Sequence, residues 1–376
     1  MDIETILSHA GSQWDRLTGA ISTPIYQATA YKHPYLGYEG DFSYSRTLSP
    51  TRQALEQTLA RIEGVDYAYT FSSGMAAVDT IFRLLKPKDK IIISEDLYGG
   101  TFRLLNQTYK SYDFDVLYID TSDNDAVDKA FKGGATAVFV EMPTNPLLKV
   151  ADIRYISALA KKAGALLIVD NTFLTPLNIR VFDYGADIAV YSATKYLSGH
   201  NDVLAGAVAV KDSVLAERIQ FTQNAVGAVL APFDAWLLLR SLKTLSVRLS
   251  KQSENAIKIA QFLAEHPAVE QVNYPGLADS PFYERLKSQS AGFGAMLSFW
   301  LKSSERVADI LRSVKVWTFA ESLGGVESLI TYPLTQTHSS IDANILERLG
   351  INDRLLRLSV GVENVDDLIT DLKNVL

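Results

Sequence analysis

The chain has 376 residues, 47% of them hydrophobic, which is enough for one large domain and a smaller one, each with its own core. Its formal net charge of -7 and its lack of any run of Lys or Arg argue against a nucleic-acid or anionic membrane partner, so we expect a small-molecule partner. Without cysteine it has no disulfides or thiolate metal sites, and without a signal peptide or a membrane-length apolar stretch it is predicted to be cytoplasmic.

Residues 1–50 are predicted to form an arm that lies against another surface, because they show little periodicity and many aromatic side chains. These side chains are Tyr26, Tyr31, Tyr35, Tyr38, Phe42 and Tyr44. A helix is predicted next, from Pro50, which suits a first helical turn, to Gly64, which suits a C-terminal cap. Ser49 precedes this helix and can cap its N-terminus.

A large α/β domain is predicted over residues 51–245. Short runs rich in Ile and Val alternate with helical or loop segments, a pattern typical of strands that are covered on both faces in a mainly parallel sheet. The predicted strands are residues 67–71, 90–94, 115–119, 137–141, 166–170, 188–192 and 206–210.

A smaller α+β domain is predicted over residues 246–376. An unbroken helical pattern from Phe233 to Glu265 is expected to link it to the large domain. Turn residues are expected in 266–276. The remainder predicts two strands, in FGAMLSFWL (293–301) and LLRLSV (355–360), and helices near residues 304–314, 341–349 and 364–374.

Polar residues collect where the predicted parallel strands end, which is where binding sites lie in such sheets. Ser72, Ser73, Gly74 and Met75 follow the first strand and open a helix, whose free N–H groups can bind an anion. Taken alone, this segment is more typical of an ordinary helix cap. It is neither a P-loop nor a dinucleotide fingerprint, because GxxxxGK[ST] is absent and the nearest GxGxxG match, at Gly292, lacks its third glycine.

Three further residues follow predicted strands at the same edge. Asp170 ends a buried strand, where a carboxylate needs a cationic partner, although by itself it fits a helix cap or turn equally well. Tyr98 could stack on a planar ligand, although a packed tyrosine is commoner. Lys195 adds an amine in the loop after another strand. An anion cradle, a carboxylate, an aromatic ring and an amine together match pyridoxal 5'-phosphate, which is held by these four kinds of group.

At these positions the chain resembles a known family, through six segments in the expected order: YSRTLSPTR, DLYGGT, VDNTF, SATKYLSGHND, ESLGGVES and RLSVGVE. They look like the signatures of the pyridoxal-phosphate enzymes of trans-sulfuration, in cysteine and methionine metabolism, and they cover nearly the whole chain. The closest resemblance is to bacterial cystathionine γ-synthases that also act as O-acylhomoserine thiol-lyases. It implies the type I fold of pyridoxal-phosphate enzymes, similar to aspartate aminotransferase, and a homodimer as the smallest active unit, usually within a homotetramer.

The resemblance also implies roles for individual residues. It gives catalytic roles to Lys195, as Schiff-base lysine and proton carrier, and to Tyr98, as the ring stacked on the cofactor. Asp170 pairs with the pyridine nitrogen. The implied cofactor-binding residues are Tyr44, Arg46, Ser72, Gly74, Met75, Tyr98, Asp170, Ser192, Thr194 and Lys195, of which Tyr44 and Arg46 reach into the neighbouring subunit's site. The implied substrate-binding residues are Asn145, Glu321, Ser322 and Arg357. No metal site is expected, because the histidines are scattered.

Departures within the family guide the choice of reaction. Gly100 stands where methionine γ-lyases carry a cysteine, and Glu321 where dedicated β-lyases commonly carry an apolar or aromatic residue. Ser43 stands where many cystathionine γ-lyases carry an acidic residue. We therefore expect γ-replacement on an O-acylated homoserine with cysteine or another thiol, and a cystathionine γ- or β-lyase is the alternative.

Two alternatives belong to other classes of protein, a nicotinamide-dependent oxidoreductase and a non-catalytic cofactor-binding regulator. The lack of a complete GxGxxG segment weighs against the first. The lack of a basic face or a helix-turn-helix extension weighs against the second.

Overall fold

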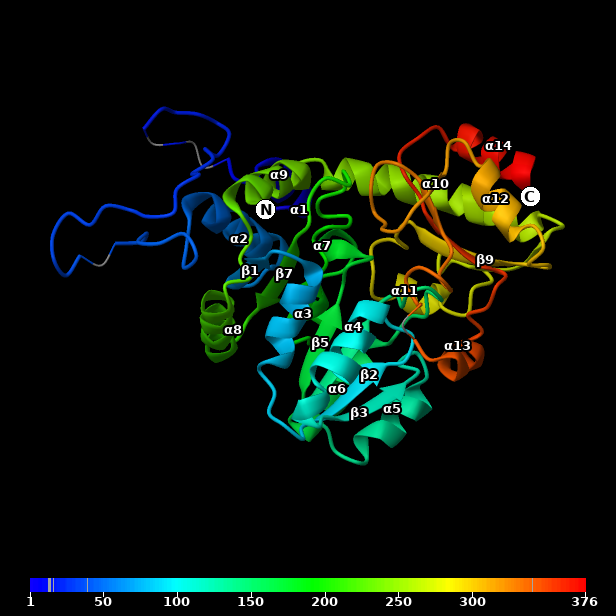
Figure 1. The fold of residues 1–376 in the computed structure, drawn as a ribbon, viewed down its shortest axis with the longest axis horizontal. Coiled ribbons are helices and arrows are strands. Elements are labelled where there is room, and N and C mark those ends of the chain that lie inside the picture. The colour runs from blue at the N-terminus through cyan, green and yellow to red at the C-terminus, as the bar shows by residue number, and fades with distance from the viewer. Residues whose placement is uncertain (13–14, 16, 39, 340) are drawn as a thin grey trace.

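The computed structural model describes every residue except 13, 14, 16, 39 and 340, and it places them around two sheets (Figure 1). Within this described part, seven strands form a large mixed sheet in the spatial order β1 (Tyr67–Phe71), β7 (Gly206–Val210), β6 (Ile188–Tyr191), β5 (Leu166–Asp170), β4 (Ala137–Glu141), β2 (Lys90–Ser94) and β3 (Asp115–Ile119). Strand β7 pairs antiparallel with both neighbours, and the other pairs are parallel. The prediction of a mainly parallel α/β sheet is confirmed.

Both faces of the large sheet are buried, which explains the continuous apolar runs of its strands. Ile92 packs into one core cluster, and its chain neighbours Ile91 and Ile93 pack into another. Helices and short helical turns cover these faces (Figure 1). They are α3 (Gly74–Phe82), α4 (Gly99–Arg103), η1 (Leu104–Thr108), η2 (Lys110–Tyr112), α5 (Asn124–Phe131), α6 (Ile153–Ala163), α7 (Thr175–Asn178), η3 (Val181–Tyr184) and α8 (Ser213–Val226).

The helix predicted after the N-terminal arm is α2 (Pro50–Glu63), and both of its predicted caps are present. The hydroxyl of Ser49 accepts a hydrogen bond from the Arg52 amide, and Gly64 takes the left-handed conformation with φ 69°. The arm itself contains only one described helix, α1 (Ile3–Ser8), and its later part projects away from the rest of the chain (Figure 1).

The C-terminal part is an α+β unit, as predicted. Its sheet has five strands among the described residues, in the order β10 (Thr318–Phe319), β11 (Leu329–Thr331), β12 (Leu355–Ser359), β9 (Met296–Leu301) and β8 (Val269–Asn273). Its helices are α11 (Tyr283–Lys287), α12 (Val307–Ser313), α13 (Ala343–Leu349) and α14 (Val365–Val375). The prediction of turns in 266–276 was wrong for β8. This strand lies at an edge of the sheet and exposes Glu270 and Gln271, so it lacks a core pattern.

The prediction of one continuous helix from Phe233 to Glu265 was also wrong. Two helices, α9 (Pro232–Leu242) and α10 (Leu245–Glu265), meet at Lys243 and Thr244. The Ser241 carbonyl, which an uninterrupted helix would bond to the amide four residues later, accepts from the guanidinium of Arg248 at 3.0 Å. That guanidinium also donates to the Tyr196 carbonyl, near the end of β6, so a contact distant in the sequence stabilises the break.

Candidate active site

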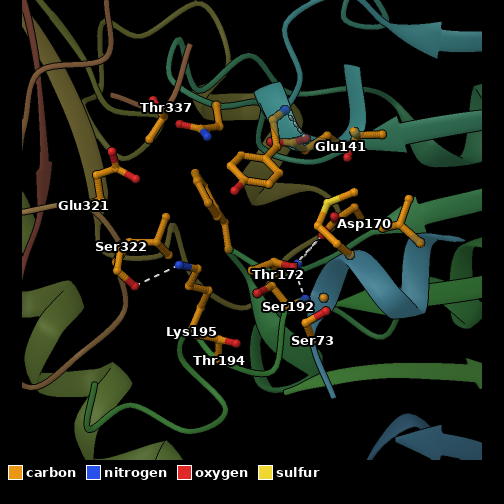
Figure 2. Close-up of a pocket in the computed structure, with 18 of the residues that line it drawn as sticks. Ser73, Glu141, Asp170, Thr172, Ser192, Thr194, Lys195, Glu321, Ser322 and Thr337 are labelled. Atoms are coloured by element: carbon orange, nitrogen blue, oxygen red, sulfur yellow. Dashed lines mark hydrogen bonds between the residues drawn. The ribbon is translucent and has the colours of Figure 1, made fainter. Parts of the chain in front are cut away.

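A cavity of about 240 Å3 opens at the carboxyl ends of the parallel strands, between the large sheet and the C-terminal unit. Figure 2 shows Ser73, Asp170, Thr172 and Ser192 on one side, Glu321 and Ser322 on the other, and Lys195 between them. The predicted residues that line the cavity are Gly74, Met75, Tyr98, Asn145, Asp170, Ser192, Thr194, Lys195, Glu321, Ser322 and Arg357. Residues that lie almost 300 positions apart in the sequence, such as Gly74 and Arg357, therefore line the same cavity.

Three predicted residues do not line this cavity. Ser72 is exposed, and its neighbour Ser73 faces the cavity instead. Tyr44 and Arg46 lie on the arm, where the guanidinium of Arg46 is 5.5 Å from the ring centre of Tyr44 and donates to the side chain of Asn224 at 3.0 Å. If these two arm residues serve a cavity, it is that of another copy of the chain.

The N-terminus of α3 forms one wall and is suited to a phosphate. Ser73 caps the helix by accepting from the Ala76 amide at 3.1 Å, and the first-turn amides of Gly74 and Met75 have no helical acceptor and can bind an anion. A Cβ on Gly74 would lie 2.8 Å from Cβ of Ser192. Glycine is therefore needed for the close approach of α3 to the loop that follows β6.

Asp170 ends β5 and is held by one neighbour. The amide and the hydroxyl of Thr172 both donate to Oδ1 of Asp170, at 3.0 and 2.6 Å. Burial raises the pKa of Asp170 to about 6, and the hydrogen bonds from Thr172 oppose that rise. The carboxylate is thus fixed in orientation but has no ion-pair partner among the described residues, and it remains available to a cationic ligand.

Lys195 projects into the cavity from the loop after β6. Its Nζ donates to Oγ of Ser322 at 2.8 Å. Burial, with a smaller contribution from Arg357, lowers the pKa of Lys195 to about 8, against the opposing effect of Glu321. About a tenth of this amine is therefore unprotonated at pH 7, far more than for an ordinary lysine, and the unprotonated form is the nucleophile. Ser322 has φ 95°, an uncommon backbone conformation for a residue with a side chain.

Arg357 comes from β12, in the C-terminal unit, and is only 1% exposed. Its guanidinium donates to Oδ1 of Asn145 and to the carbonyl of Ser322, both at 2.9 Å. Burial lowers the pKa of Arg357 to about 10, so the group stays charged at neutral pH. Its Nε has no partner within the described part of the chain, although the residue lines the cavity. A buried, partly unsatisfied guanidinium of this kind suits a carboxylate.

Several cavity residues were missed from the sequence. Thr172 orients Asp170, and Phe173, Leu323 and Thr337 complete the walls. Glu141 is the most informative omission, because it ends β4 as Asp170 ends β5. The same signal, a carboxylate that closes an apolar run, was present at both positions. Glu141 accepts from the amide of Tyr98 at 2.9 Å.

A mainly parallel sheet with an anion cradle, a ring, a carboxylate and a lysine at its strand ends defines a type I pyridoxal-phosphate enzyme. The residues present fit that cofactor, since Gly74 lets the first turn of α3 lie close to Ser192 and Asp170 has no ion-pair partner among the described residues. Within the described residues, no cluster of acidic or histidine side chains could hold a metal ion. Among the helices of these described residues, none has the length and apolar character needed to span a membrane.

Comparisons with known proteins agree with this class. A family model described as Cys/Met metabolism PLP-dependent enzyme matches residues 4–376. A cystathionine γ-synthase/O-acetylhomoserine (thiol)-lyase of Bacillus subtilis is 48% identical, covering 100% of this chain and 96% of its own length. A cystathionine β-lyase of Lactococcus lactis subsp. cremoris is 47% identical over 100% and 98%. The solved structure of a cystathionine γ-lyase from Lactobacillus plantarum complexed with L-serine has a TM-score of 0.96 at 43% identity, over 99% and 98%.

This chain belongs to the Cys/Met metabolism family of pyridoxal-phosphate-dependent enzymes, among the cystathionine synthases and lyases. The relatives include synthases and both kinds of lyase at similar identity, so identity alone does not select one reaction.

Proposed function

We propose that this enzyme catalyses γ-replacement on an O-acylated homoserine, with cysteine or another thiol as the nucleophile. The observation that carries this choice is that Glu321 is accompanied by an uncharged residue, Ser43, where the family can carry a second acid. Glu321 contributes the one carboxylate that the C-terminal unit places on the described cavity wall. Cystathionine has a distal amino acid group whose ammonium benefits from fixed acidic partners, whereas an O-acylhomoserine has no such ammonium. Because Ser43 supplies no second acid, the site suits the acylated substrate better.

In this proposal Lys195 is the residue that handles amines and protons. When bound, pyridoxal phosphate supplies an aldehyde that takes up an amine and a ring that withdraws electrons from the substrate. Nζ of Lys195 would hold the cofactor through its aldehyde and give up that place to the substrate amine. The freed Nζ then moves protons at Cα and Cβ, and its lowered pKa suits both acceptance and donation. The hydrogen bond to Ser322 keeps Nζ inside the cavity.

The remaining residues hold the reactants in place. Asp170 would favour a protonated ring nitrogen through its negative charge, and the ring of Tyr98 would hold the cofactor by stacking. The first turn of α3, with Ser192 and Thr194, holds the phosphate. Arg357 pairs with the substrate α-carboxylate beside Asn145, to which it is already hydrogen-bonded.

The overall reaction balances without an oxidant or reductant. The bond between Cγ and the acyl oxygen breaks, and a bond between Cγ and the thiol sulfur forms. The thiol proton leaves with the carboxylic acid.

The arm gives the proposal its quaternary part. Residues 1–50 would lie on a neighbouring copy, where Tyr44 and Arg46 complete the phosphate site. The exposed apolar side chains Leu17, Ile21, Tyr35 and Leu36 support this placement, because an apolar surface of this kind favours burial in an interface. A homodimer is then the smallest active unit, within a homotetramer.

The test is a side-by-side measurement of kcat/KM for three substrates: O-acetylhomoserine plus cysteine, O-succinylhomoserine plus cysteine, and cystathionine alone. We expect one of the acylated homoserines to give the highest value. Ser43→Glu should improve cystathionine use chiefly through KM, and Ser43→Gln, which has similar size without the charge, should not. If the unmodified enzyme cleaves cystathionine more efficiently than it replaces the acyl group, the lyase assignment takes the place of this one.

A further inference from the structure

We propose that Glu141 is a positioning residue of this site, which in its protonated form anchors the backbone of Tyr98 and leaves a single negative charge, on Asp170, beneath the cofactor ring. The inference rests on the proposed pairing of Asp170 with the ring nitrogen. It concerns cofactor binding and is independent of which substrate the enzyme uses.

The geometry places the two carboxyl groups side by side. Glu141 and Asp170 are register partners at the ends of the parallel strands β4 and β5, so their side chains emerge on the same side of the sheet. Both line the cavity, and Figure 2 shows Glu141 beside the aromatic ring at the top of the pocket. Neighbouring strands lie about 4.8 Å apart, too close for two buried negative charges without a cation between them.

The hydrogen bonds of the two groups differ in a way that assigns the charge. Asp170 receives both the amide and the hydroxyl of Thr172, and such donors favour the ionised form. Glu141 receives the amide of Tyr98, which a neutral carboxyl can accept through its carbonyl oxygen. The backbone of Tyr98 therefore needs an acceptor at this place and does not need a charge.

The charged groups that face Glu141 also favour its protonated form. They come from three elements: Asp170 on β5, Asp96 after β2 and Arg357 on β12. Burial raises the pKa of Glu141 well above its usual range, Asp170 and Asp96 reinforce the rise, and the Tyr98 amide and Arg357 oppose it. No ion pair to Glu141 exists among the residues that the structure describes. Asp170, with a pKa of about 6, ionises first.

The consequence for function is twofold. Glu141 accepts a hydrogen bond from the backbone amide of Tyr98 and so holds that residue in place. This limits how far the Tyr98 ring can move from the cofactor. The ends of β4 and β5 then carry one negative charge, on Asp170, which matches one protonated ring nitrogen.

Glu141→Gln and Glu141→Ala separate the acceptor from the charge. The full-length protein is freed of cofactor, and binding is measured with pyridoxal 5'-phosphate by its visible absorbance and circular dichroism. Gln keeps the carbonyl acceptor and should bind as well as the unmodified protein, with an unchanged visible circular dichroism band. Ala leaves the Tyr98 amide unsatisfied, so its affinity should fall about tenfold and its band should change. Glu95→Gln, the same change at the end of the adjacent strand β2, is the matched control and should alter neither.

Each outcome bears on the proposal. Equal losses for Gln and Ala would show that the charge of Glu141 is used, and unchanged binding in both would show that it positions nothing. If Ala fails to fold, the pH dependence of unfolding decides. A raised carboxyl pKa costs stability as pH rises above the ordinary glutamate pKa, so Gln should gain melting temperature over the unmodified protein as the pH is raised through and beyond that ordinary value. No gain contradicts a protonated Glu141, whereas an unmodified protein that binds no cofactor refutes the site itself.

Discussion

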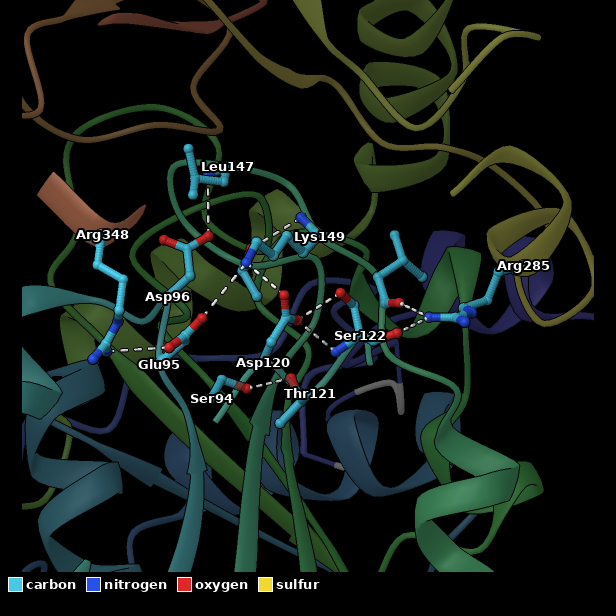
Figure 3. A network of polar contacts seen from close by, with 12 residues as sticks. Ser94, Glu95, Asp96, Asp120, Thr121, Ser122, Leu147, Lys149, Arg285 and Arg348 are labelled. Atoms are coloured by element: carbon cyan, nitrogen blue, oxygen red, sulfur yellow. Dashed lines mark hydrogen bonds and ion pairs between the residues drawn. The ribbon is translucent and has the colours of Figure 1, made fainter. Parts of the chain in front are cut away.

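The carboxyl edge of the large sheet carries two groups of acidic residues. Both groups lie at or directly after the ends of parallel strands, but they differ in whether a cationic side chain lies beside them. After β2 and β3, Glu95 and Asp120 are neutralised by fixed cations (Figure 3). Nζ of Lys149 lies 2.6 Å from Asp120, and the guanidinium of Arg348 lies 3.2 Å from Glu95. At the ends of β4 and β5, Glu141 and Asp170 have no such partners in the described chain.

The pKa values of one aspartate from each group, Asp120 and Asp170, differ accordingly. Burial alone would raise the pKa of Asp120, but the hydrogen bond and charge of Lys149, together with the hydrogen bonds from Ser122, bring it below its usual range. Asp170, equally a strand-end aspartate, keeps a raised pKa. A strand-end carboxylate thus becomes structural where the chain supplies a cation and reactive where the cation must come from a ligand.

The polar network of Figure 3 also joins the two parts of the molecule. Arg348 belongs to α13 of the C-terminal unit and Arg285 to α11, and both reach residues of the large sheet region, Glu95 and the carbonyl of Val150. These contacts hold the C-terminal unit beside the cavity. They do not enter the cavity, so we expect changes there to alter stability and changes in the cavity to alter chemistry.

The largest expected effect is on turnover, when the lysine of the cavity is replaced and compared with replacement of the lysine of the network. Lys195→Ala should lower turnover by about 10³-fold or more, because in the proposed mechanism this one amine both holds the cofactor and carries protons. Lys149→Met, in the network, should retain turnover. Steady-state rates of both variants at saturating cofactor check this expectation, and comparable turnover of Lys195→Ala and the unmodified enzyme would remove Lys195 from the mechanism.

A second experiment asks whether the cavity obtains a cation from another copy. Arg46→Ala and Lys195→Ala should each be inactive alone, and mixing them under subunit exchange should restore activity. In a mixed dimer one site receives both defects and the other neither, so about one quarter of the sites become intact with random exchange. Mixtures that exchange fully, as shown by mass spectrometry of labelled subunits, and yet stay inactive would mean that Arg46 serves no neighbouring site.

Breaking the network should have a smaller effect, and on stability alone. Lys149→Met leaves Glu95 with Arg348 but removes the cation from Asp120, so the free energy of unfolding should fall by about 1–2 kcal/mol, since the pair is only partly buried. Because Asp120 has a lowered pKa, the stability that the pair contributes is present above the ordinary aspartate pKa and is lost as pH falls through the folded value. Denaturant unfolding at neutral and acidic pH should therefore show the difference between variant and unmodified protein shrinking in acid.

The smallest effect is a difference in reactivity between the same two lysines. In cofactor-free protein, burial lowers the pKa of Lys195 to about 8. Burial also acts to lower the pKa of Lys149, but the hydrogen bond and charge of Asp120, together with the charges of Asp96 and Glu95, outweigh it and raise that pKa. Labelling with acetic anhydride, read by peptide mass spectrometry over a pH series, should modify Lys195 with a midpoint near that value while Lys149 stays unmodified. Labelling of both at the same pH would contradict the electrostatic contrast between the regions.

Much of this arrangement could be predicted from residue patterns, because it depends on local physics. The seven strands of the large sheet were predicted nearly to the residue, since buried parallel strands are continuous Ile and Val runs. Asp170, Tyr98 and Lys195 were found because each follows such a run. The break at Thr244 was missed because it depends on Arg248, whose guanidinium bonds the Ser241 carbonyl and also the carbonyl of Tyr196, which is distant in the chain. Strand β8 was missed because an edge strand needs no apolar alternation.

The sequence by itself determined the sheet, the family and the set of groups suited to pyridoxal phosphate. Strand burial and helix capping depend on residues that are close together in the chain, so short segments are enough to predict them. Only the tertiary structure decided that Ser73 rather than Ser72 faces the cavity, that Ser322 meets Lys195, and that Glu141 stands beside Asp170. It also decided which acidic residues are neutralised, because the cations of the network come from Lys149 and from Arg348, over 200 residues beyond Glu95 in the chain. The charge of a carboxyl group depends on what surrounds it in space, and no short segment contains those surroundings.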